Sequence, residues 1–469
     1  MLNRIIYKTN LIVENLLKKL FSLSREDFLF FVFLLFSFFI TLFTYKYGLK
    51  KSLVVELFAF SVFSMFYNFG VGLVLSLYSI SMFEIPPTQI ITLNIPLPTT
   101  FAYLLIFIVF GFVFIKTKFL TKVEKKDLIV VFLYSSLIIF YSILGFLKGG
   151  LYRYDLKPEF VLFMMWNFAI LLTYSFKNEK EAKIVFYGTI LFVIILDLII
   201  FQAYLRKAYS LGPRIYTRQA FIYSMIMPYL FAWLLLEKKK SIKIFLAILF
   251  FVSIIAMLIT LTRTIVIGLL ISFFIIFMWW KRFSLKTLIQ ASIATGVFTG
   301  ILYKIITLNP MLYKRFYEKV VYFYKDWSFL LRIIVGYDTI MFYGKKLLIG
   351  MGIAHPFAFR PGLFEFTWSP WIDIAYLAIM GKIGILGLSF MLYFLIRPFV
   401  LALKVYYKIP YKQKEFKILA LGTIGFVPSF LLENLMFSIM IKYIFFYAAL
   451  ILLSLFYFYY KEYKDYLKN

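Results

Sequence analysis

Apolar runs of about twenty residues recur along most of this chain, and they limit its fold more than any other feature. A helical run of that length spans the hydrocarbon core of a bilayer. Backbone groups in lipid must be hydrogen-bonded within the protein, and the sequence lacks the short alternation of barrel strands. We therefore predict an all-α, polytopic helical membrane protein with about 12 to 14 transmembrane helices and one large loop.

The predicted transmembrane segments form two groups, which are separated by one long polar region. They are expected at residues 28–44, 52–83, 101–116, 127–147, 158–175, 183–203, 220–236, 244–261, 264–280, 287–304, 373–398, 416–433 and 437–460. The segment at 52–83 is long enough for two helices.

These segments divide the chain into five parts. Residues 1–27 form an amphipathic basic stretch without a cleavage site, which we expect on the cytoplasmic membrane surface. A transmembrane bundle over 28–304, a large periplasmic loop over 305–372, C-terminal helices over 373–460 and a cytoplasmic tail over 461–469 follow.

Basic residues strongly outnumber acidic ones, with 51 Lys and Arg against 22 Asp and Glu. In a membrane protein such a surplus belongs mainly to the short loops that stay in the cytoplasm. The lysine-rich connections are 117–126, 177–183, 237–243, 281–286 and 404–417. Their positions place the 305–372 loop on the opposite side of the membrane, and no nucleic-acid partner is expected.

The chain has no cysteine and a single histidine, which narrows the chemistry available to it. Without cysteine it has no disulfides, thiolate metal sites or thiol nucleophiles. One histidine disfavours a zinc site. We expect neither a metal nor another cofactor.

The segment from Thr307 to Trp371 is the only long part of the chain that cannot be a membrane span. It carries the single histidine, His355, directly after a turn at Gly350-Met351-Gly352 and Ile353-Ala354. We expect this loop and its edges to meet the substrate, because hydrophobic helices flank it on both sides and no other long segment lies outside the membrane.

Several arginines are expected on the same side as the loop. Arg263 stands between two apolar runs, Arg214 and Arg218 lie in the next-longest loop, and Arg332 begins an apolar loop helix. An arginine at a membrane segment usually faces a wet cavity or a partner, although Arg263 alone also fits a snorkelling residue at a helix end. Guanidinium groups that converge there would suit phosphate oxygens.

The order of these motifs resembles that of the O-antigen polymerase and O-antigen ligase superfamily. Arg332 is followed after 17 residues by Gly350-Met351-Gly352, and Asp373-Ile374 is followed after nine by Gly384. Thr262-Arg263-Thr264 is similar to the family's Ser-Arg-Gly element, and the resemblance covers roughly residues 180–400.

Four positions depart from the family pattern. Gly336 stands where the family usually has Trp, Leu347 where it often has Pro, and Thr264 where it often has Gly. Asp373 occupies the position that a histidine holds in ligases. The acidic residue therefore favours a polymerase over a ligase.

The resemblance implies transfer of a glycan from an undecaprenyl-diphosphate carrier to an acceptor hydroxyl, at the periplasmic face of the bacterial inner membrane. In a polymerase the acceptor is another carrier-linked repeat unit, whereas in a ligase it is the lipopolysaccharide core. The implied partners are a lipid-linked oligosaccharide donor and acceptor, membrane lipids and a chain-length regulator. A ligase is the first alternative, and a lipid-linked oligosaccharide flippase is a second, although no internal duplication is visible.

The resemblance also implies roles for individual residues. Arg263 and Arg332 would stabilise the leaving diphosphate, and Asp373 would act as the general base. Asp373 could at the same time cap the helix that follows it. The remaining expected substrate-binding residues are Arg214, Arg218, His355, Arg360, Gly350 and Gly352. His355 also fits a structural hydrogen-bonding role, and Arg360 also fits an exposed surface charge.

Three acidic residues, Glu56, Asp197 and Glu433, fall inside apolar segments. A charge is costly in a membrane, so we expect these carboxyl groups to be structurally paired or protonated.

Overall fold

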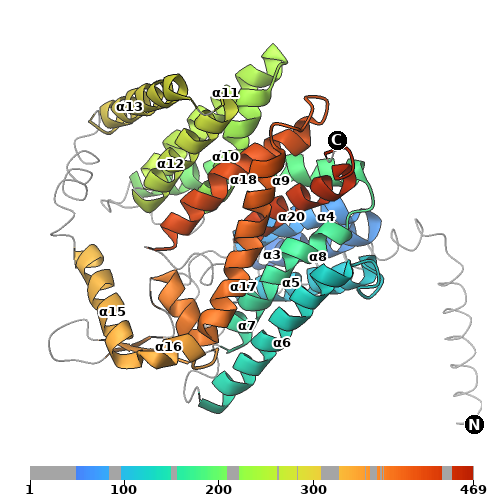
Figure 1. Ribbon diagram of the computed structural model, residues 1–469, viewed down its shortest axis with the longest axis vertical. Helices are drawn as coiled ribbons and strands as arrows, with labels where there is room; N and C mark the ends of the chain where they lie inside the picture. Colours follow the sequence, from blue (N-terminus) through green and yellow to red (C-terminus); the bar gives the residue numbers. More distant parts are fainter. Residues whose placement is uncertain are drawn as a thin grey trace, which may run out of the picture.

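The computed structural model describes residues 49–83, 97–148, 156–208, 221–260, 263–282, 284–307, 327–353, 355–359, 367–369, 372, 374–435 and 446–467. Nearly all of these residues are helical, as Figure 1 shows. Five described helical stretches are long and apolar enough to cross a membrane: Lys125–Lys148, Glu179–Gln202, Lys240–Ile259, Ala375–Val405 and Lys414–Glu433. The all-α, polytopic membrane fold is thereby confirmed, while the total of 12 to 14 spans stays a prediction.

The elements follow one another in a simple order along the chain. The helices before the long loop are α3 (Leu49–Tyr67), α4 (Phe69–Phe83), α5 (Leu97–Lys116), α6 (Lys125–Lys148), α7 (Leu156–Met164), η3 (Met165–Asn167), α8 (Phe168–Leu171), η4 (Leu172–Tyr174), α9 (Glu179–Ala208), α10 (Phe221–Leu236), α11 (Lys240–Ile259), α12 (Arg263–Trp280) and α13 (Leu285–Thr307). The loop region holds α15 (Trp327–Tyr343), α16 (Lys345–Ile349), β1 (Phe357–Phe359) and β2 (Thr367–Ser369). The last helices are α17 (Ala375–Val405), α18 (Lys414–Glu433) and α20 (Tyr447–Tyr463).

The long apolar segment near the start of the described chain is indeed two helices. The break falls at Asn68, whose side-chain Oδ1 accepts a hydrogen bond from the Val71 N–H at 3.2 Å and so begins α4. Gly72 lets α4 approach α3 closely, since a Cβ there would lie 2.3 Å from Met65 Cγ. One apolar run thus becomes a tight helical pair.

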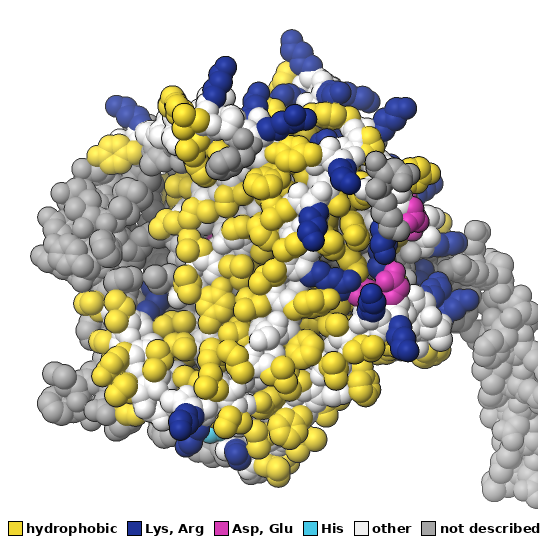
Figure 2. Space-filling view, viewed as in Figure 1, with side chains coloured by type: hydrophobic (Ala, Val, Ile, Leu, Met, Phe, Trp, Pro, Cys, Tyr) yellow, Lys and Arg dark blue, Asp and Glu magenta, His cyan; other side chains and the backbone are white. Residues whose placement is uncertain are grey.

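The core of the bundle lies around α18 and α20. Both helices are buried along most of their length, and their aromatic side chains stack on one another, for example Phe416 on Tyr459 with ring centroids 6.0 Å apart. By contrast, α6 exposes large apolar side chains such as Phe132 and Phe140. Figure 2 shows the hydrophobic belt that such side chains form, which fits contact with lipid.

The two ends of the bundle are formed by different kinds of element. At one end, here called the lysine-rich face, loops are joined by contacts such as the ion pair of Lys414 with Glu237 and the bond from Lys408 Nζ to the Leu467 carbonyl. Basic side chains gather along this edge in the upper part of Figure 2.

At the other end, here called the loop face, lie α15, α16 and the β1–β2 hairpin, in the lower part of Figure 1. The two strands pair antiparallel, with Phe357 opposite Ser369. Two helices and two short strands therefore make up most of the described part of the expected loop.

Candidate functional site

The Gly350-Met351-Gly352 turn lies wedged between α6 and α17 at the loop face. Both of its glycines have positive φ values, 89° at Gly350 and 114° at Gly352, which side chains disfavour. A Cβ at Gly350 would lie 2.6 Å from the nitrogen of Gly384, and one at Gly352 would lie 2.5 Å from the nitrogen of Gly145. The turn therefore requires glycine both for its conformation and for its close contacts.

Backbone hydrogen bonds fix this turn to two helices. The bonds run from the Met351 N–H to the Gly381 carbonyl at 2.7 Å, from Gly352 to Lys382 at 3.0 Å, and from Ile353 to Tyr141 at 2.9 Å. The carbonyls of α17 are free to accept because the helix breaks at Gly384, where φ is 68°. The break in the transmembrane helix and the turn of the loop thus fit together.

An ion pair buried beneath the turn joins α7 to α17. Lys382 Nζ lies 2.7 Å from Oε1 and 2.6 Å from Oε2 of Glu159, and both side chains are fully buried. The ring of Phe357 lies above the ammonium group, with its centroid 5.8 Å away. Sequence reasoning missed this pair, although both residues are ionisable groups in apolar segments, a signal that usually marks a partner.

His355 follows the turn and is half-buried. Its backbone N–H donates to the Gly352 carbonyl at 3.2 Å, and its ring nitrogen Nδ1 lies 2.8 Å from the Pro356 carbonyl. Burial lowers the pKa of His355; the Pro356 carbonyl opposes this shift, and the positive charges of Lys382, Lys148 and Lys346 add to it. The ring is therefore neutral near pH 7.

Arg332 lies on α15 and is half-buried, with its Nε atom shielded from solvent. Gly336, one turn later on the same face, packs against the start of α17: a Cβ there would lie 2.6 Å from Ile374 Cδ1. Ile374 also occupies the N-cap position of α17. Asp373 itself lies outside the described residues, whereas Ile372 and Ile374 on either side of it are described.

The other predicted site residues are only partly covered by the structure. Arg263 is the first residue of α12, but its side chain is outside the described part. Arg214, Arg218 and Arg360 lie outside the described residues altogether. Of the predicted set, the structure therefore locates the side chain of Arg332, the two turn glycines and His355, all in the loop region.

Glu433 is an acidic residue at the loop-face end of α18, and it forms no ion pair with a described residue. It is 1% exposed, and its described polar neighbour is the Ser224 hydroxyl, which also donates to the Phe221 carbonyl at 2.8 Å. Gly268 of α12 leaves room for the Glu433 carboxyl group, since a Cβ at that position would lie 1.9 Å from Oε1. Asp197, in contrast, accepts bonds from Tyr223 at 2.5 Å and Ser253 at 2.8 Å.

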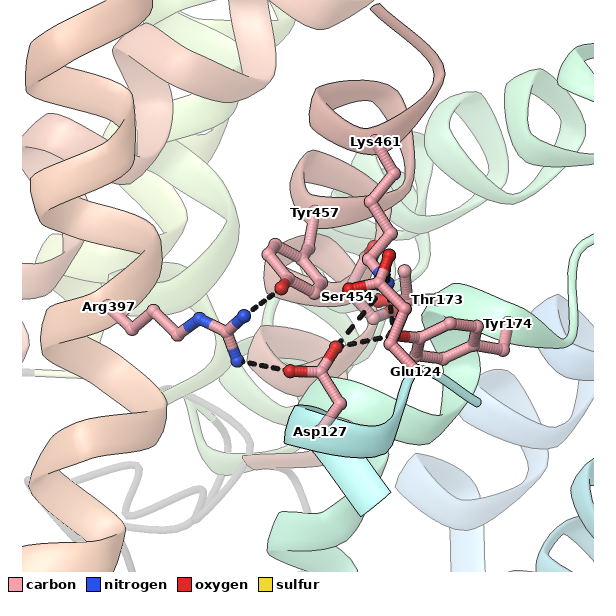
Figure 3. Close-up of polar contacts among 8 residues, drawn as sticks. All are labelled: Glu124, Asp127, Thr173, Tyr174, Arg397, Ser454, Tyr457 and Lys461. Carbon is pink, nitrogen blue, oxygen red and sulfur yellow. Dashed lines mark hydrogen bonds and ion pairs between the residues drawn. The ribbon is translucent and has the colours of Figure 1, made fainter. Parts of the chain in front are cut away.

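A second polar cluster lies at the lysine-rich face and is drawn in Figure 3. Asp127 Oδ1 lies 2.6 Å from Arg397 Nη1, while Oδ2 accepts a bond from Tyr174 at 2.5 Å. Lys461 lies 2.7 Å from Glu124 and 3.4 Å from Asp127. Two cations balance two acids, so the cluster serves to join α6, α17 and α20 and leaves no charge for a ligand.

Comparison with known proteins adds no relative to this picture. Neither the models of protein families nor the curated proteins include a match to the chain. Function must therefore be argued from the loop face and its residues.

Proposed function

We propose that this protein is an inner-membrane polymerase that joins undecaprenyl-diphosphate-linked oligosaccharide units at the periplasmic face. The proposal combines the motif order around Arg263, Arg332 and Asp373 with the membrane-spanning helical fold. The lysine-rich face would be cytoplasmic, because basic loops are retained on that side. The loop face, with its ordered turn and half-buried arginine, would then contact the substrates.

The packing of α15 against α17 supports this proposal most directly. Arg332 stands one helical turn before Gly336, and Gly336 contacts Ile374, the residue next to Asp373 in the chain. Arg332 therefore lies on a helix that contacts the residue directly after Asp373 in the chain, although the two motif residues are 41 positions apart in the sequence. An arginine and an acid on neighbouring elements suit a reaction with an anionic leaving group and a hydroxyl nucleophile.

The proposed reaction is a single displacement at a sugar carbon. The acceptor hydroxyl oxygen attacks the anomeric carbon of the donor, and its proton passes to the carboxylate of Asp373. The bond between that carbon and the diphosphate oxygen breaks, and the electron pair leaves with undecaprenyl diphosphate. Arg332 and Arg263 stabilise the charge that develops on this leaving group.

Polymerisation by the purified full-length protein is the direct test. The protein in nanodiscs is supplied with lipid-linked repeat units, and chain length is read by gel electrophoresis or mass spectrometry. Arg332→Ala and Asp373→Asn should each reduce the rate by about 100-fold or more. Arg282→Ala and Glu462→Gln, at exposed positions near the lysine-rich face, are matched controls that should retain the rate.

Other outcomes would point to the alternatives. Transfer of the glycan to lipopolysaccharide core, without elongation on the carrier, would indicate a ligase. Movement of lipid-linked glycan across the bilayer without any elongation would indicate a flippase. Wild-type rates in the Asp373→Asn protein would remove the general-base role.

A further inference from the structure

Three basic side chains from separate elements gather around the turn at the loop face. Lys148 ends α6, three residues after Gly145, whose Cα lies close to the Gly352 backbone. Lys346 belongs to α16, and its carbonyl accepts a bond from the Gly350 N–H at 2.8 Å. His355 follows the turn, and the two lysines are close enough to act electrostatically on its ring. We call Lys148, Lys346 and His355 the basic cluster.

The charge of this cluster is not balanced by the residues that the structure describes. Lys148 and Lys346 are both exposed, and no described acidic side chain forms an ion pair with either of them. The nearby Lys382 is neutralised by Glu159 below the turn. The surface therefore carries an excess positive charge that an anion would neutralise, in contrast to the balanced cluster of Figure 3.

Exposed apolar side chains adjoin the basic cluster on three helices. On α6, Ile143 is 58% and Leu147 is 66% exposed; on α16, Ile349 is 70% exposed; on α17, Ile385 is 47% exposed. The helices meet here, since Tyr141 donates a hydrogen bond to the Ile349 carbonyl, and that carbonyl also lies close to Gly384. Positive charge beside an apolar surface at the end of a transmembrane helix matches an anionic lipid better than a soluble anion.

The basic cluster is separate from the position of Arg332. The His355 ring lies against Tyr343, with centroids 6.4 Å apart, at the end of α15. Arg332 stands eleven residues earlier on the same helix, which corresponds to about 16 Å along its axis. The basic cluster and Arg332 therefore lie towards opposite ends of α15, which suits two separate anionic groups better than one.

We propose that Lys148, Lys346 and His355 bind the diphosphate headgroup of a membrane lipid, whose chain lies along the apolar surface of α6, α16 and α17. The inference rests on the proposed function in one respect: a polymerase holds two lipid-linked substrates at once. Arg332 and Arg263 serve the donor, whose diphosphate leaves. The basic cluster then holds the diphosphate of the acceptor, which stays intact during the reaction.

Binding without turnover tests this site. The full-length protein in nanodiscs is titrated with undecaprenyl diphosphate, and native mass spectrometry counts the bound lipids. The wild type should bind two lipid molecules. In the Lys148→Ala/Lys346→Ala protein the affinity for the second lipid should fall about 10-fold or more, so that only one stays bound. The control Lys122→Ala/Lys126→Ala removes equal charge from exposed positions at the lysine-rich face and should behave as the wild type.

Two results would overturn the proposal. One is unchanged stoichiometry and affinity in the Lys148→Ala/Lys346→Ala protein. The other is displacement of the second lipid by inorganic diphosphate as readily as by undecaprenyl diphosphate, which would indicate a site for a free anion. A protein that binds two lipids but never elongates glycan would contradict the polymerase assignment and leave the lipid site standing.

Discussion

Lys382 and Glu159 form an ion pair that is fully buried, with the ammonium nitrogen 2.6 and 2.7 Å from the two carboxylate oxygens. The pair lies where the loop turn meets the bundle, because the carbonyl of Lys382 accepts the Gly352 N–H. It therefore positions the turn as well as joining α7 to α17.

Removal of one partner of this pair should be strongly destabilising. Glu159→Gln or Lys382→Met leaves an uncompensated polar group in an apolar interior, at a cost of about 3 to 5 kcal/mol. The double variant removes both charges and should recover much of the loss. Thermal unfolding in detergent measures this, and single variants with wild-type melting temperatures would contradict a buried pair.

The turn glycine should tolerate no side chain. Gly352→Ala places a Cβ within 2.5 Å of the Gly145 nitrogen at a positive φ, so stability should fall by more than about 1 kcal/mol. Gly111→Ala on α5 is the control, because a Cβ there has no atom within 4 Å. The same melting experiment should show the control equal to or above the wild type. Equal loss in both variants would mean that the turn is not wedged between helices.

Sequence patterns predicted much of the helical layout, because apolar length is a local property. The segment expected at 183–203 lies within α9, and the one at 52–83 divides at Asn68 as its length suggested. The partner of Lys382 could not be predicted, since Glu159 is 223 residues away and only the packing of α7 on α17 brings them together. Lys148 was missed for a related reason: its role depends on which loop docks beside it.

Acid should weaken the contacts that hold the lysine-rich face together. Burial opposes ionisation of Glu237, but hydrogen bonds from Lys414, the Lys239 N–H and Trp233 outweigh it and lower the pKa of Glu237 to about 2. A carboxyl with a depressed pKa stabilises the fold above its usual value of 4.5. That contribution is lost as the pH falls from 4.5 towards 2. Glu237→Gln should melt lower at neutral pH and show a flatter decline in acid.

Asp197 and Glu433, which are both buried, should respond differently when each carboxyl group is replaced by the corresponding amide. Asp197→Asn should destabilise the protein by about 1 kcal/mol or more, because the amide nitrogen cannot accept the bond that Tyr223 or Ser253 donates. Glu433→Gln should cost less than this, because the described polar neighbour of its carboxyl group is the Ser224 hydroxyl, which already donates to the Phe221 carbonyl at 2.8 Å. Chemical denaturation of both variants measures the two losses, and a loss at Glu433 equal to that at Asp197 would contradict this difference.

Lipid binding at the basic cluster should strengthen as the pH falls. Burial keeps the pKa of His355 below its usual value in the free protein, and the positive charges of Lys382, Lys148 and Lys346 lower it further. The Tyr343 ring lies against the imidazole, and the carboxylate of Glu159 is held by Lys382. A bound diphosphate would favour the protonated ring, so binding would take up a proton. The ratio of the wild-type affinity to the His355→Gln affinity should therefore rise as the pH falls from about 7.5 to about 5.5. Protonation of the diphosphate itself affects both proteins equally, so it cancels in this ratio. A ratio that stays constant with pH would exclude His355 from the site.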